Sequence, residues 1–166
     1  MMNTIHASYG SRIKFIYRNF PLTQIHKNAY DASVAAEAVY LQDANKFWEM
    51  QNQLFTNQAV WSNMPDARPT FKEYVQKIGL DVVRWETDVA GMMAKNRVGA
   101  DMERGRALNV GGTPTIYING QPVSNPQMSV EGMRQIIDAE LDKGAAPAQN
   151  PPPAQPANPS NANSNK

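Results

Sequence analysis

The spacing of apolar residues changes along the chain from a period of two to a helical period. Between Ile13 and Arg18, polar residues alternate with apolar or aromatic ones, which predicts a β-strand that ends before Pro21. From Asn28 to about residue 108, apolar residues recur at helical spacing and predict a series of helices. A second strand is predicted at Thr115–Ile118, and the following Asn119-Gly120 is the strongest short hairpin signal.

Helix boundaries are also marked by particular residue types. Thr70 to Glu73 has the form of a capping box, and Gly79 is expected to end that helix. Asp81 is expected to cap the next helix. Asn109 stands where a left-handed residue would end a longer helix, and Ser129 can cap the last helix. The predicted order is strand, several helices, hairpin and helix.

Length and composition indicate a single globular domain, and they do not indicate nucleic acid or a membrane as a partner. The chain has 166 residues, of which 42% are apolar, enough to bury one continuous core. Sixteen basic and fifteen acidic residues give a net charge of +1 without charged runs, so neither nucleic acid nor an anionic membrane is indicated as a partner. No stretch predicts a membrane span, and the first residues do not resemble an export signal.

The last 23 residues differ from the rest in composition. Residues 144–166 consist almost entirely of Ala, Pro, Asn, Gln and Ser, which cannot bury enough apolar surface to offset the entropy of ordering. We therefore predict a domain over residues 1–143 and a disordered tail over 144–166. A ligand for a proline-binding domain is the less favoured alternative for this tail.

Three stretches, in this order and spacing, resemble the DsbA-like branch of the thioredoxin superfamily. The first is Tyr17–Leu22 with the following His26 and Ala29. The second runs from Ala35–Ala38 through Phe47–Met50 to Leu54-Phe55, and the third is Gly112–Thr115 before Ile118–Gly120. The resemblance implies a mixed α/β fold, α+β by count, of the thioredoxin type. It also implies a helical insertion over about residues 28–98.

In that family a Cys-x-x-Cys pair at the start of the first helix exchanges disulfides, because a helix N-terminus stabilises the thiolate. This sequence contains no cysteine, so it has no catalytic residue for that chemistry. Met1–Gly10 resembles the end of that first helix. We therefore expect the first strand, the cysteine pair and the helix start to be missing, as in an N-terminally truncated protein. The missing strand is central in the fold, so its loss should leave sheet edges that a partner strand or a second copy could cover.

The resemblance supplies one candidate binding site, the Gly112-Thr113-Pro114 loop. Pro114 is expected to follow a cis peptide bond, and the backbone of Thr113 is expected to hydrogen-bond an extended protein or peptide substrate. No cofactor is implied. The two histidines, His6 and His26, have no second ligand at metal-binding spacing, so no metal site is predicted.

Several other side chains have a functional and a structural interpretation. Glu37 and Glu49 could relay protons, but solvated or capping carboxylates are the favoured interpretation. Trp48, Trp61 and Trp85 are expected to lie in the core.

The sequence therefore favours a DsbA-like thioredoxin-fold protein that is redox-inactive as given. Whether it is an enzyme remains open. The alternative is a cysteine-free, chaperone-like adaptor that binds peptides at the cis-proline loop, and a third possibility is that the proline-rich tail is the functional element. The family suggests a periplasmic or other extracytoplasmic location, which this chain does not itself indicate.

Overall fold

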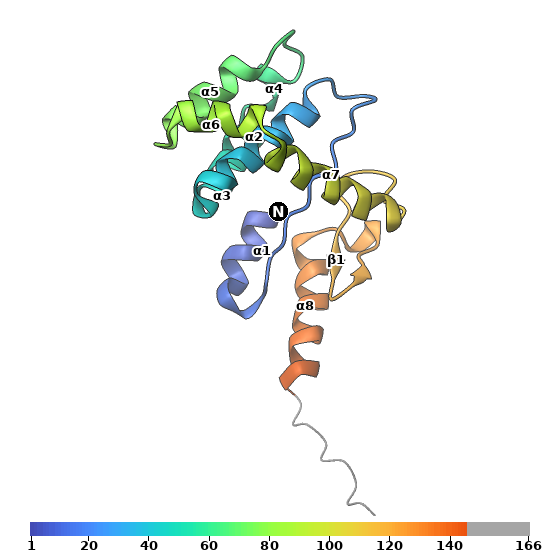
Figure 1. Ribbon diagram of the computed structural model, residues 1–166. Helices are drawn as coiled ribbons and strands as arrows, with labels where there is room; N and C mark the ends of the chain where they lie inside the picture. The colour runs from blue at the N-terminus through green and yellow to red at the C-terminus, as the bar shows by residue number, and fades with distance from the viewer. Residues whose placement is uncertain (146–166) are drawn as a thin grey trace, which may run out of the picture. The chain divides into compact units, whose positions relative to one another are not determined.

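The computed structural model describes residues 1–145, which form helices and one small sheet (Figure 1). The α-helices are α1 (Met2–Tyr9), α2 (Ala29–Gln42), α3 (Phe47–Thr56), α4 (Gln58–Trp61), α5 (Arg68–Lys77), α6 (Val82–Ala90), α7 (Met92–Ala107) and α8 (Val130–Ala145). The 3₁₀ helices are η1 (Gly10–Arg12), η2 (Ala44–Lys46) and η3 (Asn125–Gln127), and the strands are β1 (Tyr117–Ile118) and β2 (Gln121–Pro122).

The chain folds into two compact units. One is continuous and comprises His6–Ile116, and the other, among the described residues, combines Met1–Ile5 with residues 117–145.

The unit His6–Ile116 is built around α2, which packs against α3, α5, α6 and α7 (Figure 1). Small residues on α2 explain this central position. Ala35, Ala36 and Ala38 are buried, and their short side chains let neighbouring helices approach closely. The larger side chains around them include Phe71, Trp85 and Val98, which are also fully buried and fill the space between the helices.

Local capping chemistry explains several helix boundaries. The side chain of Asp81 accepts hydrogen bonds from the backbone N–H groups of Val83 and Arg84 at 2.8 and 3.0 Å, so its predicted role as the cap of α6 is confirmed. Gly79 follows α5 with a φ of +79°, and Asn109 follows α7 with a φ of +54°. Both predicted helix ends are therefore confirmed, with left-handed residues where they were expected.

The capping box predicted from Thr70 is wrong. Helix α5 begins earlier, at Arg68, whose backbone N–H donates to Asp66 Oδ1 at 2.9 Å. Pro69 lies in the first turn, where its missing N–H costs nothing because that group has no helical partner. Thr70 thus lies inside the helix, and its hydroxyl faces the sulfur of Met64 at 3.4 Å.

The segment Ile13–Arg18 is not a strand, contrary to the prediction. Its residues belong to no strand or helix, although Ile13 has the dihedral angles of an extended chain, φ −126° and ψ 150°. A strand requires a ladder, and among residues 1–145 the only sheet pairs β1 with β2. The alternation still orients side chains, because Phe15 and Tyr17 both contact the ring of Trp48.

The predicted burial of Trp48 in the core is also wrong. Its side chain remains 42% exposed, whereas Trp61 and Trp85 lie in the core as predicted.

The second unit contains the hairpin and α8. Tyr117 pairs with Pro122 and Ile118 with Gln121 across a turn in which Asn119 and Gly120 both have positive φ, as the hairpin signal predicted. The ladder is shorter than the predicted strand, which began at Thr115.

Helix α8 is capped by Ser129, whose hydroxyl accepts the N–H of Gly132 at 3.0 Å, as predicted. The helix continues through Gly144 to Ala145, two residues into the predicted tail, and the rest of that tail lies outside the described residues.

Candidate functional site

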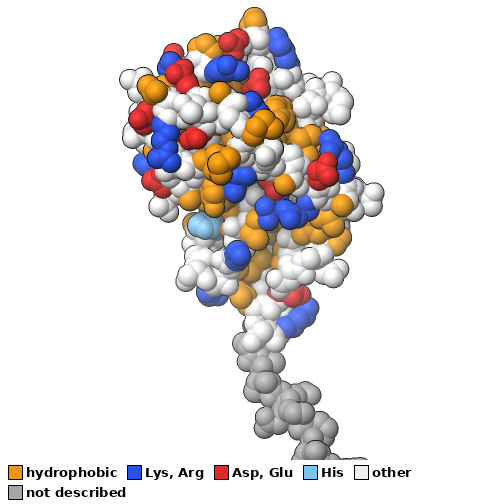
Figure 2. All heavy atoms as spheres, in the orientation of Figure 1, with side chains coloured by type: hydrophobic (Ala, Val, Ile, Leu, Met, Phe, Trp, Pro, Cys, Tyr) orange, Lys and Arg blue, Asp and Glu red, His pale blue; other side chains and the backbone are white. Residues whose placement is uncertain are grey.

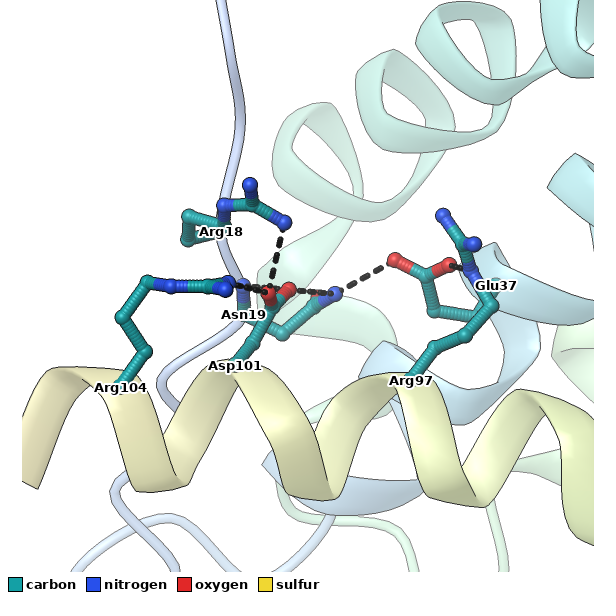
Figure 3. A network of polar contacts seen from close by, with 6 residues as sticks. All are labelled: Arg18, Asn19, Glu37, Arg97, Asp101 and Arg104. Carbon is teal, nitrogen blue, oxygen red and sulfur yellow. Dashed lines mark hydrogen bonds and ion pairs between the residues drawn. The ribbon is translucent and has the colours of Figure 1, made fainter.

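A network of buried polar side chains joins the extended segment Tyr17–Pro21 to α2 and α7. Asn19 is its centre and is only 1% exposed. Its side-chain amide donates to Glu37 Oε1 at 2.7 Å and more weakly to Asp101 Oδ2 at 3.4 Å. Figure 3 shows Asn19 between these two carboxylates, with Arg18 and Arg104 beside Asp101 and Arg97 beside Glu37.

Asp101 fixes the backbone of the extended segment. Its Oδ2 accepts the backbone N–H of Asn19 at 3.0 Å, and its Oδ1 accepts from Arg18 Nη1 at 3.0 Å. Arg104 lies further away, with Nη1 at 3.8 Å from Oδ1. Because Asp101 is only 7% exposed, these donors replace the water that its charge would otherwise bind.

Glu37 is the second buried acid, at 4% exposure, and its Oε2 accepts from Arg97 Nε. Burial alone would lower the pKa of Arg97, but the hydrogen bond and the charge of Glu37 outweigh it and raise that pKa. The guanidinium also lies 4.2 Å from the centre of the Tyr40 ring, a cation–π contact. Glu37 therefore binds other protein groups, and its predicted solvated or capping role is wrong.

The two carboxylates also act on Tyr17. Burial, followed by the charges of Glu37 and Asp101, raises the pKa of Tyr17 to about 12. All three causes disfavour the phenolate, so the phenol stays protonated at neutral pH.

The predicted Gly112-Thr113-Pro114 loop follows the C-terminal end of α7. The Thr113-Pro114 peptide bond is cis, and Thr113 and Pro114 are exposed. The hydroxyl of Thr115 donates to the carbonyl oxygen of Gly112 at 2.6 Å, which holds the loop closed. Within residues 1–145, the backbone N–H and C=O of Thr113 make no hydrogen bond.

Helix α7 connects the network to the loop. Asp101 lies in its C-terminal half, and one turn later Gly105 contacts Phe20 so closely that a Cβ at Gly105 would lie 2.5 Å from the Phe20 ring. The backbone N–H of Val110 then donates to the carbonyl of Gly105 at 2.9 Å. Contacts from Asn19 and Phe20 thus hold the end of α7 from which the loop begins.

The loop and the network differ in what they can do chemically. The loop presents unpaired backbone groups in an exposed, closed turn, which suits hydrogen bonding to another extended backbone. The network pairs most of its buried donors and acceptors with protein groups, although Asn19 Oδ1 has no partner among the described residues, and it supports the loop through α7. No group of three or more metal-ligating side chains occurs among residues 1–145.

Sequence reasoning found the loop and missed the network. The loop was found through the family resemblance. In the sequence Glu37 is one carboxylate among several on predicted helices, and no local pattern marks Asn19 or Asp101 as its partners. An Asn beside an extended segment and two carboxylates on helices are common, and only folding brings them together.

The hydrophobicity of the helices and the distribution of surface charge bear on the protein's possible partners. None of the helices within residues 1–145 has the length and hydrophobicity required for a membrane span. On the face drawn in Figure 2, basic and acidic side chains are interspersed, in keeping with the net charge of +1.

Comparison with known proteins identifies the family. The sequence profile of the thioredoxin family, described as "Thioredoxin", matches residues 3–139. The crystal structure of the thiol-disulfide exchange protein alpha-DsbA2 from Wolbachia pipientis superposes with a TM-score of 0.68. It has 20% sequence identity and covers 83% of this chain and 72% of that one. This likeness confirms the thioredoxin-like fold with a helical insertion.

Curated relatives include proteins with different names. The chain is 33% identical over 129 residues to the Na(+)/H(+) antiporter NhaA 1 of Mycolicibacterium gilvum, covering 75% of this chain and 19% of that protein. It is 30% identical over 136 residues to the "Probable disulfide bond formation protein D" of Bacillus cereus, covering 80% and 60%. The chain thus spans about a fifth of the antiporter relatives. From the profile match, the fold and these relatives, we conclude that the chain belongs to the thioredoxin family and is a DsbA-like member of that superfamily.

Proposed function

We propose that this chain binds extended polypeptide segments at the Gly112-Thr113-Pro114 loop, as the substrate-holding part of a DsbA-like protein. The observation that carries the proposal is the exposed backbone of Thr113, whose N–H and C=O have no hydrogen-bond partner within residues 1–145. An extended peptide can use such groups as an added strand does.

The sequence itself supplies no thiolate. Disulfide exchange proceeds by attack of a thiolate on a disulfide sulfur, and none of the 166 residues is cysteine. The proposed role of these residues is therefore binding, and the purified chain should show no turnover in an insulin-reduction assay. Turnover in that assay would contradict the proposal.

Binding is tested with a matched pair of loop variants. The probe is insulin B chain, reduced and alkylated so that it remains extended and cannot exchange thiols. We expect it to shift the backbone amide resonances of the loop, among them that of Gly112, which both loop variants retain. Thr113→Pro removes the N–H and should abolish binding, whereas Thr113→Ala keeps the backbone and should bind like the unmodified chain. Equal binding by both variants would refute a backbone contact.

A cysteine-free adaptor is the second candidate, and the absence of cysteine from this sequence favours it. The two candidates differ in whether the protein in its native source carries thiols together with this sequence. Maleimide labelling of the reduced protein from that source, followed by mass spectrometry, separates them. A labelled Cys-x-x-Cys pair supports the oxidoreductase, and an unlabelled protein supports the adaptor.

A further inference from the structure

A small cavity of about 140 Å³ lies beside the polar network, where the extended segment meets α2 and α7. All but one of its lining residues have polar side chains: Tyr17, Arg18, Glu37, Arg97, Asp101 and Arg104. The lining therefore combines three guanidinium groups with two carboxylates, an excess of one positive charge. The binding proposed at Thr113 uses none of these side chains.

The acceptors of this lining are already used by the protein. Asp101 accepts from Arg18 Nη1 through Oδ1 and from the backbone N–H of Asn19 through Oδ2, both at 3.0 Å. Glu37 accepts from the Asn19 amide at 2.7 Å through Oε1 and from Arg97 Nε through Oε2. Because every carboxylate oxygen has a protein donor, the lining offers little to a cation.

The donors, by contrast, exceed what the protein uses. A guanidinium carries five N–H donors. Within residues 1–145, Arg18 donates only through Nη1 and Arg97 only through Nε. Arg104 donates to no protein group there, because its Nη1 lies 3.8 Å from Asp101 Oδ1, beyond hydrogen-bond distance. The cavity is thus lined by unused donors, which suits a ligand that accepts hydrogen bonds.

Tyr17 adds a donor of a different kind. Its hydroxyl makes no hydrogen bond within the described part of the chain. Burial and the charges of Glu37 and Asp101 raise its pKa to about 12, so the phenol keeps its proton at neutral pH and can donate it in a hydrogen bond. Edge contacts with the rings of Phe47 and Trp48 hold the phenol in place.

The guanidinium groups are close enough to share one ligand. Arg18 and Arg104 approach the same oxygen, Asp101 Oδ1, with their Nη1 atoms at 3.0 and 3.8 Å (Figure 3). Arg97 lies one turn before Asp101 on α7 and lines the same cavity. The side chains of Arg18, Arg97 and Arg104 are 52%, 43% and 56% exposed, so an ion from solvent can reach them.

We propose that this cavity is a phosphate-binding site, in which the three guanidinium groups and the Tyr17 hydroxyl donate to the oxygens of one tetrahedral oxyanion. Arginine suits such an ion because its planar fork donates two parallel N–H groups to neighbouring oxygens. A carboxylate has only two oxygens and would leave some of these donors unused. The two buried acids oppose the charge of the ion, so we expect a dissociation constant of about 1–10 mM. This site goes beyond the binding proposed at Thr113 and does not depend on it.

The test follows the Nε–H resonance of Arg97 in ¹⁵N NMR while phosphate is added at constant ionic strength. The hydrogen bond to Glu37 slows exchange of this proton with water. We expect inorganic phosphate to shift the resonance until it saturates, and acetate to bind at least about tenfold more weakly. Thr113→Pro should leave the phosphate affinity unchanged.

Methyl phosphate distinguishes two sources of the same chemistry. Binding as tight as that of inorganic phosphate supports a site for the phosphoryl group of a larger molecule. Weaker binding of methyl phosphate supports a site for the free ion.

Arg104→Gln has a matched control on the same helix. Arg104 makes no hydrogen bond in the network, so its replacement should leave the fold intact and weaken phosphate binding about tenfold, as expected for a lost hydrogen bond to a charged group. Arg106→Gln removes an exposed guanidinium that also lies 3.8 Å from a carboxylate but outside the cavity, and it should have no effect. Tyr17→Phe keeps the ring and should weaken binding about two- to fivefold.

The proposal fails if the Arg97 resonance does not shift at about 20 mM phosphate, a concentration above the expected dissociation constant. It also fails if acetate binds as tightly as phosphate, which would indicate attraction to any anion. Equal effects of Arg104→Gln and Arg106→Gln would show that the cavity takes no part. Undiminished binding by Tyr17→Phe would contradict the assigned hydroxyl donor.

Discussion

Replacing Asp101 with alanine should destabilise the helical unit far more than an ordinary surface substitution. The change leaves the buried backbone N–H of Asn19 without its acceptor, which lies at 3.0 Å. Losing a hydrogen bond to a charged group costs about 1.5–3 kcal/mol. The pair with Arg18, whose side chain is half exposed, adds only about 0.2–1 kcal/mol. We therefore expect the free energy of unfolding to fall by about 2–4 kcal/mol.

Urea unfolding followed by circular dichroism measures this change. With a slope of about 2 kcal/mol per molar urea, the midpoint should fall by about 1–2 M. Glu103→Ala is the matched control, because Glu103 lies on the same helix, is largely exposed and meets Arg106 only at 3.8 Å. Its loss should cost less than about 1 kcal/mol.

A third variant separates the hydrogen bond from the charge. Asp101→Asn keeps an acceptor oxygen for the N–H of Asn19 while removing the negative charge, so it should destabilise less than Asp101→Ala. If Asp101→Ala is no more destabilising than Glu103→Ala, the network does not hold the extended segment, and the reasoning is wrong.

The remaining predictions concern packing against α7 and the titration of the partly buried phenol of Tyr17. Gly105→Ala should lower stability by about 1–3 kcal/mol in thermal unfolding, because the new Cβ would lie 2.5 Å from the ring of Phe20. Gly99→Ala, on the same helix with open space around it, should instead stabilise by up to about 1 kcal/mol, and equal effects would contradict the packing argument. Since the pKa of Tyr17 is raised to about 12, its protonated form stabilises the fold fully below pH 10, and this contribution is lost as the pH rises to 12. An absorbance titration should show late-ionising tyrosines, because burial raises the pKa of Tyr74 as well, and Glu37→Gln should lower the pKa of Tyr17; an unchanged curve would count against the electrostatic cause.

The sequence predicts the local backbone conformation correctly wherever one or two residues determine it. Asp81 caps α6 through its own side chain, and Gly79 and Asn109 end helices because they tolerate positive φ. The turn at Asn119-Gly120 follows from the same conformational preference. Each of these outcomes depends on neighbours only a few residues away.

The candidate loop was also predicted from the sequence, but through the resemblance to the DsbA-like family and not from local residue preferences. The Gly112-Thr113-Pro114 sequence indicated where to look, and the structure places Thr113 in an exposed turn. The contacts that hold that loop in place could not be predicted from the sequence. Gly105 gives no sign in the sequence that it lies against Phe20, because that contact joins residues 85 positions apart through the packing of α7.

The sequence by itself therefore determined the series of helices, the boundaries marked by Gly79, Asp81, Asn109 and Ser129, the hairpin turn and the absence of a thiol. Only the tertiary structure decided that Ile13–Arg18 forms no ladder, because a strand needs a neighbour and alternation alone cannot supply one. It also decided that Glu37 and Asp101 are buried. A carboxylate can be buried only where donors from distant segments replace water, and here Asn19 supplies them from 18 and 82 residues away.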